Sequence, residues 1–529
     1  MTSPLTDALA GRQSRFFSRS ETIRRKAPQP GTFSIASAAA FSQSYRVRTR
    51  ILWPSLIGLV VLTFPALCCR AAATATDYAI VVSQKTRADR GWREVVDTLE
   101  KKHQGKVFVF EKSVEEVLPK LRETFPRYAC FVAQPMEATR EFVARVHRLT
   151  RAFNDDPYPD CFWGILTGYD AANALRIANC REPLTVRKVA SGTEVALDSC
   201  EEGVWYCELK AGKWVQKKQS GKPEQFQGPA DSTEALAKTL TDYHADLFVT
   251  SGHATERDWQ IGYAYRNGSF RCENGTLYGL NTEKQKFPIV SPNPKVYLPI
   301  GNCLMGHIDD TNAMALAFMN SGGVNQMIGY TVTSWYGYAG WGCLDMFVEQ
   351  PGRFTFTEAF FANQVALINR LQNYFPDLAS AELDANFRPK ASITVSATAS
   401  EAGLKAQDAV GLLYDRDTVA LYGDPAWEAR MADHPKAYEQ TLTAANGKYT
   451  FEIKPNRGAE SFKPVNTNGS QRGGRPFIAW LPHRVAEAKI VEGADLMPLI
   501  APNFVLVPNP GDCDPAKTYR VVFTAKWVK

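Results

Sequence analysis

Two side chains able to perform nucleophilic and acid–base chemistry follow predicted strands in this chain of 529 residues. His253 comes after the apolar run Leu247 to Thr250, in VTSGHATERDW, and Cys303 follows Val296 to Ile300, in VYLPIGNCLMG. Sites in open α/β sheets form outside the carboxyl ends of the strands. A thiol beside an imidazole is what cysteine nucleophilic catalysis needs. The pair therefore predicts a site for cysteine nucleophilic catalysis.

The residues around the pair favour tight turns. Glycines at positions 252, 301 and 306 let the backbone turn and expose N–H groups. A helix is expected after Cys303, and its N-terminus would favour the thiolate.

Metal binding is the second chemistry that these residues allow. His307 lies four residues after Cys303, Asp309 and Asp310 follow it, and His253 is available as a further ligand. No second Cys or His completes a recognisable ligand pair, so we assign no metal ligand and expect no cofactor to be required for chemistry.

The cysteine count suggests one special thiol. Of 11 cysteines, Cys68 and Cys69 lie in an apolar run near the N-terminus, which leaves an odd number for the rest of the chain. In an oxidising compartment this predicts up to four disulfides around a free Cys303. Cys200 and Cys207, in CEEGVWYC, flank a predicted short turn and could staple a hairpin.

The net charge of +6 is concentrated at the N-terminus. Residues 1–75 carry ten Lys and Arg against two acids, which leaves a net −2 for the rest, so we expect no nucleic-acid partner. The basic segment precedes the apolar run Ile51 to Cys69 and the small residues Ala71 to Ala75, the pattern of a signal sequence cleaved near residues 73–75. The protein is thus expected to be secreted or held in the cell envelope, at the periplasm or the cell surface. The alternative is an uncleaved leader that anchors the chain in the membrane, although Pro54 and Pro65 interrupt the run.

The pattern along the chain predicts an α/β protein followed by an all-β domain. A composition of 45% hydrophobic and 22% charged residues excludes a disordered or collagen-like chain. Short apolar runs alternate with helical patterns, which favours a mostly parallel sheet flanked by helices. We predict a leader (1–75), an N-terminal α/β subdomain (76–160), a catalytic domain (161–432) with a β-rich insertion on the sheet's rim (181–230), and an immunoglobulin-like β-sandwich (433–529).

Three blocks of sequence resemble the gingipain family of cysteine peptidases, in the clan that also holds caspases and legumain. They are LFVTSGHATERDW from Leu247, VYLPIGNCLMGHIDDTNAMALAFMNSGGVNQMIGY from Val296, and LYGDPAW from Leu421. The matching features are Gly252-His253, Cys303 with Gly306, Gly322-Gly323-Val324 and Gly423-Asp424-Pro425, in the family's order.

The resemblance implies a caspase-like α/β fold and hydrolysis of peptide bonds in protein or peptide substrates. Cys303 would be the nucleophile and His253 would protonate the leaving amine, while the backbone N–H groups of Cys303 and Ala254 would form an oxyanion hole. Trp335 and Trp341 stand where the family presents an aromatic wall to substrate. The acidic segment containing Asp156 stands where the family lines its specificity pocket or binds calcium, which would favour cleavage after Arg or Lys.

Two positions depart from the family pattern. The family usually has Gly-His-Gly and Ala-Cys, whereas this chain has Gly-His-Ala254 and Asn302-Cys303. These departures favour the alternative function, a catalytically inactive homologue that acts as an envelope binding or scaffolding protein. Retention of both His253 and Cys303 favours the peptidase.

Overall fold

The computed structural model describes residues 77–334, 336–383, 392–465 and 472–528. The predicted leader lies outside these ranges. Within them, no helix has both the length and the apolar character needed to cross a membrane.

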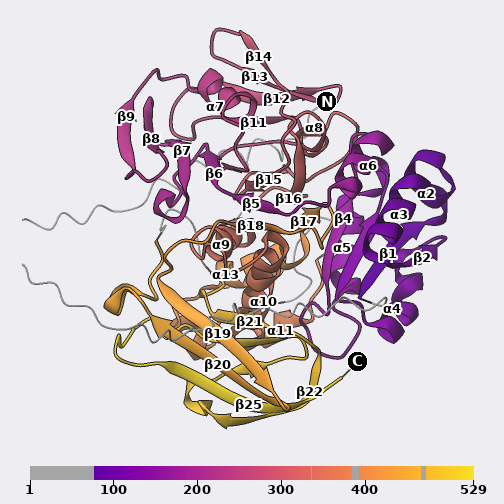
Figure 1. Ribbon diagram of the computed structural model, residues 1–529, viewed down its shortest axis with the longest axis vertical. Helices are drawn as coiled ribbons and strands as arrows, with labels where there is room; N and C mark the ends of the chain where they lie inside the picture. The colour runs from indigo at the N-terminus through magenta and orange to yellow at the C-terminus, as the bar shows by residue number, and fades with distance from the viewer. Residues whose placement is uncertain (1–76, 335, 384–391, 466–471, 529) are drawn as a thin grey trace, which may run out of the picture. The chain divides into compact units, whose positions relative to one another are not determined.

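Four parallel strands form the first part of a 12-stranded central sheet, in the order β2-β1-β3-β4 (Figure 1). Three of them are runs of buried apolar residues, as in parallel sheets covered on both faces, whereas β2 lies at the sheet edge and exposes Val109. The apolar runs of all four strands predict burial on both faces, which is wrong for β2. The strands are β1 (Tyr78–Ser83), β2 (Lys106–Phe110), β3 (Tyr128–Val132) and β4 (Phe162–Leu166).

Most of the helices that connect or follow these strands begin at a side chain that caps them. Asp89, Thr139 and Asp170 accept backbone N–H groups at the starts of α3, α5 and α6. The helices are α2 (Gln84–Ala88), α3 (Arg90–His103), α4 (Leu118–Thr124), α5 (Arg140–Leu149) and α6 (Ala171–Asn179).

The sheet continues through β17 into a second run of strands, in the order β4-β17-β16-β15-β10-β6-β7-β8-β9. Because β17 is parallel to β4 and antiparallel to β16, the two parts of the sheet run in opposite directions. The amino end of β4 therefore lies at the same edge as the carboxyl ends of β10 and β15. These strands are β17 (Val419–Tyr422), β16 (Val324–Tyr330), β15 (Lys295–Pro299), β10 (Leu247–Thr250), β6 (Lys188–Ser191), β7 (Glu202–Tyr206), β8 (Lys213–Lys217) and β9 (Glu224–Gln227).

The helices of this second part complete the α/β pattern. Thr355 and Glu358 form a capping box at the start of α10. A large, mostly parallel sheet flanked by helices confirms the predicted α/β class. The helices are α7 (Thr233–Thr241), α8 (Met314–Asn320), α9 (Tyr338–Phe347), α10 (Phe356–Tyr374), α11 (Pro376–Ala379), α12 (Ala397–Glu401) and α13 (Ala406–Asp417).

The 181–230 segment extends the sheet instead of forming only a hairpin on its rim. β6 pairs in parallel with both β10 and β7, and only β8 and β9 add antiparallel strands. Cys200 and Cys207 stand on either side of β7, whose rise of about 3.3 Å per residue separates them by roughly 20 Å. A disulfide needs Cα atoms within about 7 Å, so the predicted staple is wrong. All nine cysteines of the described residues are free thiols.

A four-stranded antiparallel sheet and a two-stranded parallel sheet accompany the central sheet. A four-stranded sheet, β11-β12-β13-β14, lies between β10 and β15 in sequence, and β5 (Leu184–Val186) pairs with β18 (Ala429–Met431). The strands of the four-stranded sheet are β11 (Asp258–Gln260), β12 (Ser269–Glu273), β13 (Thr276–Leu280) and β14 (Lys286–Ile289).

The C-terminal region forms two antiparallel sheets that share one core. Phe451 and Phe523 of the first sheet and Phe477 and Val505 of the second belong to this core. The layered all-β arrangement agrees with the predicted sandwich, while the immunoglobulin-like topology stays a prediction. The first sheet has the order β19 (Tyr438–Ala445), β20 (Lys448–Pro455), β25 (Tyr519–Trp527), β22 (Val485–Glu492); the second has β21 (Phe477–Trp480), β24 (Phe504–Val507), β23 (Leu499–Ile500).

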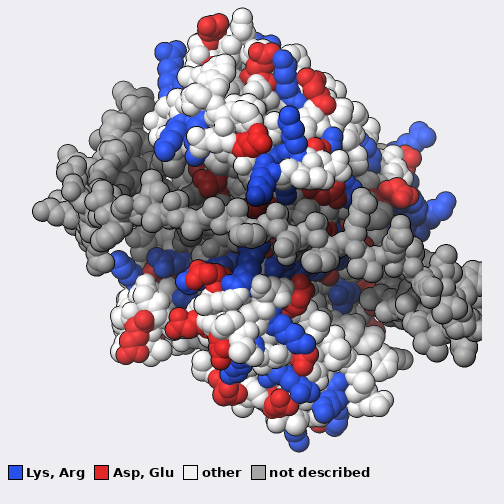
Figure 2. Space-filling model, turned by 60° about the vertical axis from the view of Figure 1, so that its left-hand side comes forward, with Lys and Arg blue, Asp and Glu red and all other residues white. Residues whose placement is uncertain are grey.

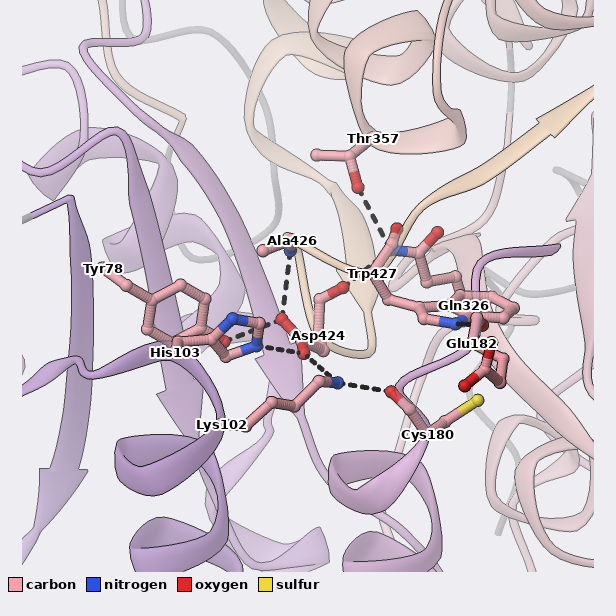
Figure 3. A network of polar contacts seen from close by, with 10 residues as sticks. All are labelled: Tyr78, Lys102, His103, Cys180, Glu182, Gln326, Thr357, Asp424, Ala426 and Trp427. Carbon is pink, nitrogen blue, oxygen red and sulfur yellow. Dashed lines mark hydrogen bonds and ion pairs between the residues drawn. The ribbon is translucent and has the colours of Figure 1, made fainter. Parts of the chain in front are cut away.

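The Gly-Asp-Pro segment after β17 is held by a buried polar network (Figure 3). Asp424 accepts hydrogen bonds from the Tyr78 hydroxyl at 2.7 Å, from Lys102 Nζ at 2.9 Å and from His103 Nε2 at 2.7 Å. Burial alone would raise the pKa of Asp424, but the His103 and Lys102 side chains hold it well below its ordinary value. The network ties β1 and α3 to the end of β17.

Charged side chains of both signs are interspersed on the face shown in Figure 2. This mixed surface agrees with the near-zero net charge of the chain after residue 75.

Candidate active site

His253 and Cys303 follow neighbouring parallel strands. β10 pairs with β15 in the register Leu247 with Val296, ending with Thr250 opposite Pro299. His253 lies three residues beyond the end of β10 and Cys303 four residues beyond the end of β15. The two predicted site residues are therefore on adjacent loops at one edge of the sheet.

A buried side chain connects these two loops. Asn302 is fully buried, and its Nδ2 donates to the carbonyl oxygen of Gly252 at 3.0 Å. Its Oδ1 accepts the hydroxyl of Thr250 at 2.7 Å. The residue before Cys303 is thus hydrogen-bonded to the residue before His253.

The His253 ring is exposed and stacks on Tyr263, with ring centroids 4.9 Å apart and planes 24° from parallel. The carbonyl of His253 accepts the N–H of Gln260 at 2.9 Å. Gly252 has φ = +92°, which glycine adopts without strain. These contacts turn the chain sharply after β10 and leave the imidazole accessible to solvent.

The Cys303 thiol is half-buried and lies against the loop that follows β16. The N–H of Ser334 points at the sulfur, with N···Sγ 3.3 Å. Burial raises the pKa of Cys303, and the hydrogen bond from Ser334 opposes this. The expected helix N-terminus is absent here, because residues 303–306 form a turn and α8 begins only at Met314. The prediction that a helix favours the thiolate is therefore wrong.

The turn after Cys303 is tightly packed. Leu304 has φ = +57°, a left-handed conformation that costs an L-residue about 1–2 kcal/mol, and its N–H donates to the carbonyl of Val332 at 3.1 Å. A Cβ on Gly306 would lie 2.3 Å from the carbonyl oxygen of Gly329. Only glycine fits at position 306, which explains this part of the motif physically.

The backbone amide of Ala254 is compatible with the predicted oxyanion hole. Ala254 pairs with Trp259 in an isolated antiparallel bridge whose two hydrogen bonds are made by the flanking residues. That bridge therefore leaves the Ala254 N–H unused. The role of the Ala254 and Cys303 amides stays a prediction.

The predicted aromatic wall is described in part. Trp335 lies outside the described residues. Trp341 is in the first turn of α9 and is half-buried, and its indole nitrogen lies 3.7 Å from where a Cβ of residue 301 would stand. Trp341 is thus beside the loop that carries Cys303, while its contact with substrate stays a prediction.

Asp156 lies in the loop before β4, at the same sheet edge. Its carboxylate accepts the N–H of Tyr158 at 2.9 Å and the side-chain amide of Asn154 at 3.0 Å. Burial raises the pKa of Asp156. The loop packs on the C-terminal sheets, where Tyr158 contacts Phe504 edge-on with ring centroids 5.2 Å apart. Its predicted roles, in the specificity pocket or in binding calcium, stay predictions.

Two residues near the site were not predicted from the sequence. Glu208 accepts the hydroxyls of Ser251 at 2.7 Å and Thr193 at 2.8 Å, and burial raises its pKa. The backbone carbonyl of Glu208 also accepts the N–H of Tyr263, the residue that stacks on His253. Glu208 therefore supports the His253 loop from the insertion.

Tyr414 of α13 is the second such residue. Its hydroxyl donates to the carbonyl of Thr333 at 2.5 Å, directly before the Ser334 N–H that faces Cys303. No local pattern connects α13 with the Cys303 loop, because their proximity arises from tertiary packing, in which α13 contacts α9, α10 and α5.

Three of the residues considered as metal ligands contact arginine side chains. Among the described residues, no three His, Cys, Asp or Glu side chains group as metal ligands. Asp309 and Asp310 instead form ion pairs with Arg257 at 2.8 and 2.9 Å, and His307 Nε2 lies 2.9 Å from Arg140.

Comparison with known proteins does not assign a family. No protein-family model matches the sequence, and no curated protein is significantly similar to it. A solved structure described as "Structure of Protease" aligns with 86% of this chain and 98% of its own, at 9% identity and a TM-score of 0.38. A TM-score this low carries no weight for fold or function, so the resemblance to gingipains stays a prediction based on the motifs.

Proposed function

We propose that the protein is a cysteine endopeptidase in which Cys303 is the nucleophile and His253 the general acid and base. The observation that carries this proposal is the placement of both residues on adjacent strand-end loops joined by the Asn302–Gly252 hydrogen bond. An accessible imidazole and a half-buried thiol on adjacent loops suit acyl transfer.

The chemistry follows from these positions. His253 takes the thiol proton of Cys303, and the sulfur attacks the carbonyl carbon of the scissile peptide. The N–H groups of Cys303 and Ala254 stabilise the negative oxygen of the tetrahedral intermediate. The C–N bond breaks as His253 returns the proton to the leaving amine. Water, deprotonated by His253, then hydrolyses the thioester and restores the thiol.

A specific observation favours the second candidate, an inactive binding or scaffolding protein. Burial raises the pKa of Cys303, and its sulfur receives a hydrogen bond from Ser334 but has no helix N-terminus beside it. Such a thiol becomes a nucleophile only if an imidazole accepts its proton. The two candidates therefore differ in whether His253 acts on Cys303.

Export and specificity belong to the proposal as well. The basic and apolar character of residues 1–75 supports export to the envelope or medium. Pairing of Asp156 with a basic substrate side chain would favour cleavage after Arg or Lys.

The test is a cleavage assay with a peptide library. The chain is expressed from Thr76, and wild type is compared with Cys303→Ala and His253→Ala, each with and without chelator. Cleavage by wild type alone is expected. Cleavage that persists in Cys303→Ala would contradict the peptidase, and no cleavage by any protein would favour the scaffold. Cleavage products that lack basic residues before the cut would argue against the role of Asp156.

A further inference from the structure

Asn302, one of the two departures from the family pattern, occupies the centre of a buried hydrogen-bond chain. Asn302, Thr250 and Tyr297 are all fully buried. Because the Thr250 hydroxyl donates to Asn302 Oδ1 at 2.7 Å, it accepts from the Tyr297 hydroxyl at 2.9 Å. The carbonyl of Gly252 can only accept, so the Asn302 amide must present Nδ2 to it. The donors and acceptors fix one orientation of the Asn302 side chain.

These hydrogen bonds connect the two backbone segments that carry the proposed catalytic residues. The Gly252 carbonyl belongs to the peptide unit whose nitrogen is that of His253, and a peptide unit is planar. Holding this oxygen therefore fixes the direction in which the chain continues to His253. The other end of the connection is the backbone of Asn302, whose next residue is Cys303. One short, buried side chain thus sets the separation of the thiol-bearing and imidazole-bearing segments.

We infer that Asn302 is a positioning residue that keeps His253 within proton-transfer reach of Cys303. The inference rests on the proposed function. An alanine, which the family usually has here, could make neither hydrogen bond, so this chain uses a different device to hold the two loops. In this view the departure at position 302 supports activity and does not signal its loss.

The test measures the reactivity of the Cys303 thiol, which requires no known substrate. Wild type, Asn302→Ala, Asn302→Asp and His253→Ala are alkylated with iodoacetamide between about pH 5 and pH 9, and mass spectrometry quantifies the adduct on the Cys303 peptide. Other titratable groups near the pair are Glu208, Tyr263 and Tyr414, which all variants retain.

A matched control separates positioning from simple loss of packing. Asn173 is also buried, and it too donates through Nδ2 to a carbonyl, that of Met319 at 3.0 Å, and accepts at Oδ1, from the N–H of Tyr169 at 3.0 Å. It lies after the carboxyl end of β4, at the opposite edge of the sheet from Cys303. Asn173→Ala removes an equivalent pair of hydrogen bonds away from the site.

Asn302→Ala and Asn302→Asp are expected to slow Cys303 alkylation near neutral pH about tenfold or more, because a displacement near 1 Å is enough for such losses. Their pH profiles should approach that of His253→Ala, while Asn173→Ala keeps the wild-type profile. A folded Asn302→Ala with the wild-type profile overturns the inference.

Two further outcomes also decide the inference. If Asn302→Ala does not fold, Thr250→Val is used instead, because it removes both hydrogen bonds of the Thr250 hydroxyl, to Asn302 and from Tyr297. Slowed alkylation then supports the inference, and a wild-type profile overturns it. If His253→Ala itself keeps the wild-type profile, no imidazole acts on Cys303, and the proposed function fails together with the inference.

Discussion

Substitution of Asp424 by asparagine should lower the free energy of unfolding substantially, because it breaks the network at the end of β17 (Figure 3). The Asp424 side chain is fully buried, and the side chains of its partners Lys102 and His103 are only 7% and 16% exposed. Asparagine keeps the volume but removes the negative charge, and its amide donor faces groups that are themselves donors.

The magnitude follows from burial. Removing one member of a buried ion pair leaves the other charge without compensation, which typically costs about 3–5 kcal/mol. An exposed pair provides the matched control. Asp97 pairs with Arg87 at 2.5 Å, but the two side chains are 52% and 30% exposed, so Asp97→Asn should cost less than about 1 kcal/mol.

The assay is urea unfolding of both variants and wild type at pH 7. If Asp424→Asn lowers the free energy of unfolding by less than about 1 kcal/mol, the view that this network holds the segment after β17 in place is refuted. A second variant, Asp424→Asn with Lys102→Met, should recover part of the loss because it removes the unpaired ammonium group.

The pH dependence has a defined sign. The pKa of Asp424 is held below its ordinary value, so its stabilising contribution is complete above about pH 5 and is lost as the pH falls through and below the unfolded value of about 3.9. The difference in stability between wild type and Asp424→Asn should therefore shrink on acidification. A difference that grows toward low pH would contradict this sign.

Three further predictions concern single side chains. Gly306→Ala should destabilise the protein by about 1–3 kcal/mol and slow Cys303 alkylation, because the new Cβ would overlap the carbonyl of Gly329; an unchanged unfolding midpoint would contradict this packing. Tyr414→Phe should lower the free energy of unfolding by about 1 kcal/mol and also slow Cys303 alkylation. A wild-type alkylation rate would show that the Tyr414 hydroxyl does not position the loop against which Cys303 lies. Burial lowers the pKa of Lys295 to about 7. Wild type should therefore gain stability from pH 7 to pH 10 relative to Lys295→Met, as measured by urea unfolding at each pH. Parallel pH profiles of stability for the two proteins would refute the lowered pKa.

The placement of His253 and Cys303 on adjacent loops could be predicted from local sequence. Each follows a short, buried apolar run and glycine-rich residues, and parallel strands that are neighbours bring their carboxyl ends together. The strand β10 has the bounds of the apolar run Leu247 to Thr250 for the same reason, since a run of buried apolar residues bounded by turn residues has few alternatives.

The supporting contacts could not be predicted in this way. Tyr414 and Glu208 reach the site from elements that are distant in sequence, and nothing in their local patterns indicates the partner. Cys200 and Cys207 illustrate a related error, because the residues between them alternate as an extended strand and were interpreted as a turn. The role of Asn302 became visible only when its partners were known, since sequence alone shows only a polar residue in place of a small one.

The central claim is that Cys303 is a peptidase nucleophile activated by His253. Its most direct test is labelling by a mixture of peptidyl acyloxymethyl ketones, which modify a cysteine only when it attacks a bound peptide-like carbonyl. We predict one adduct per chain on the Cys303 peptide, abolished in His253→Ala and prevented by prior alkylation of Cys303. No adduct, or adducts spread over other cysteines and unaffected by His253→Ala, would contradict the claim.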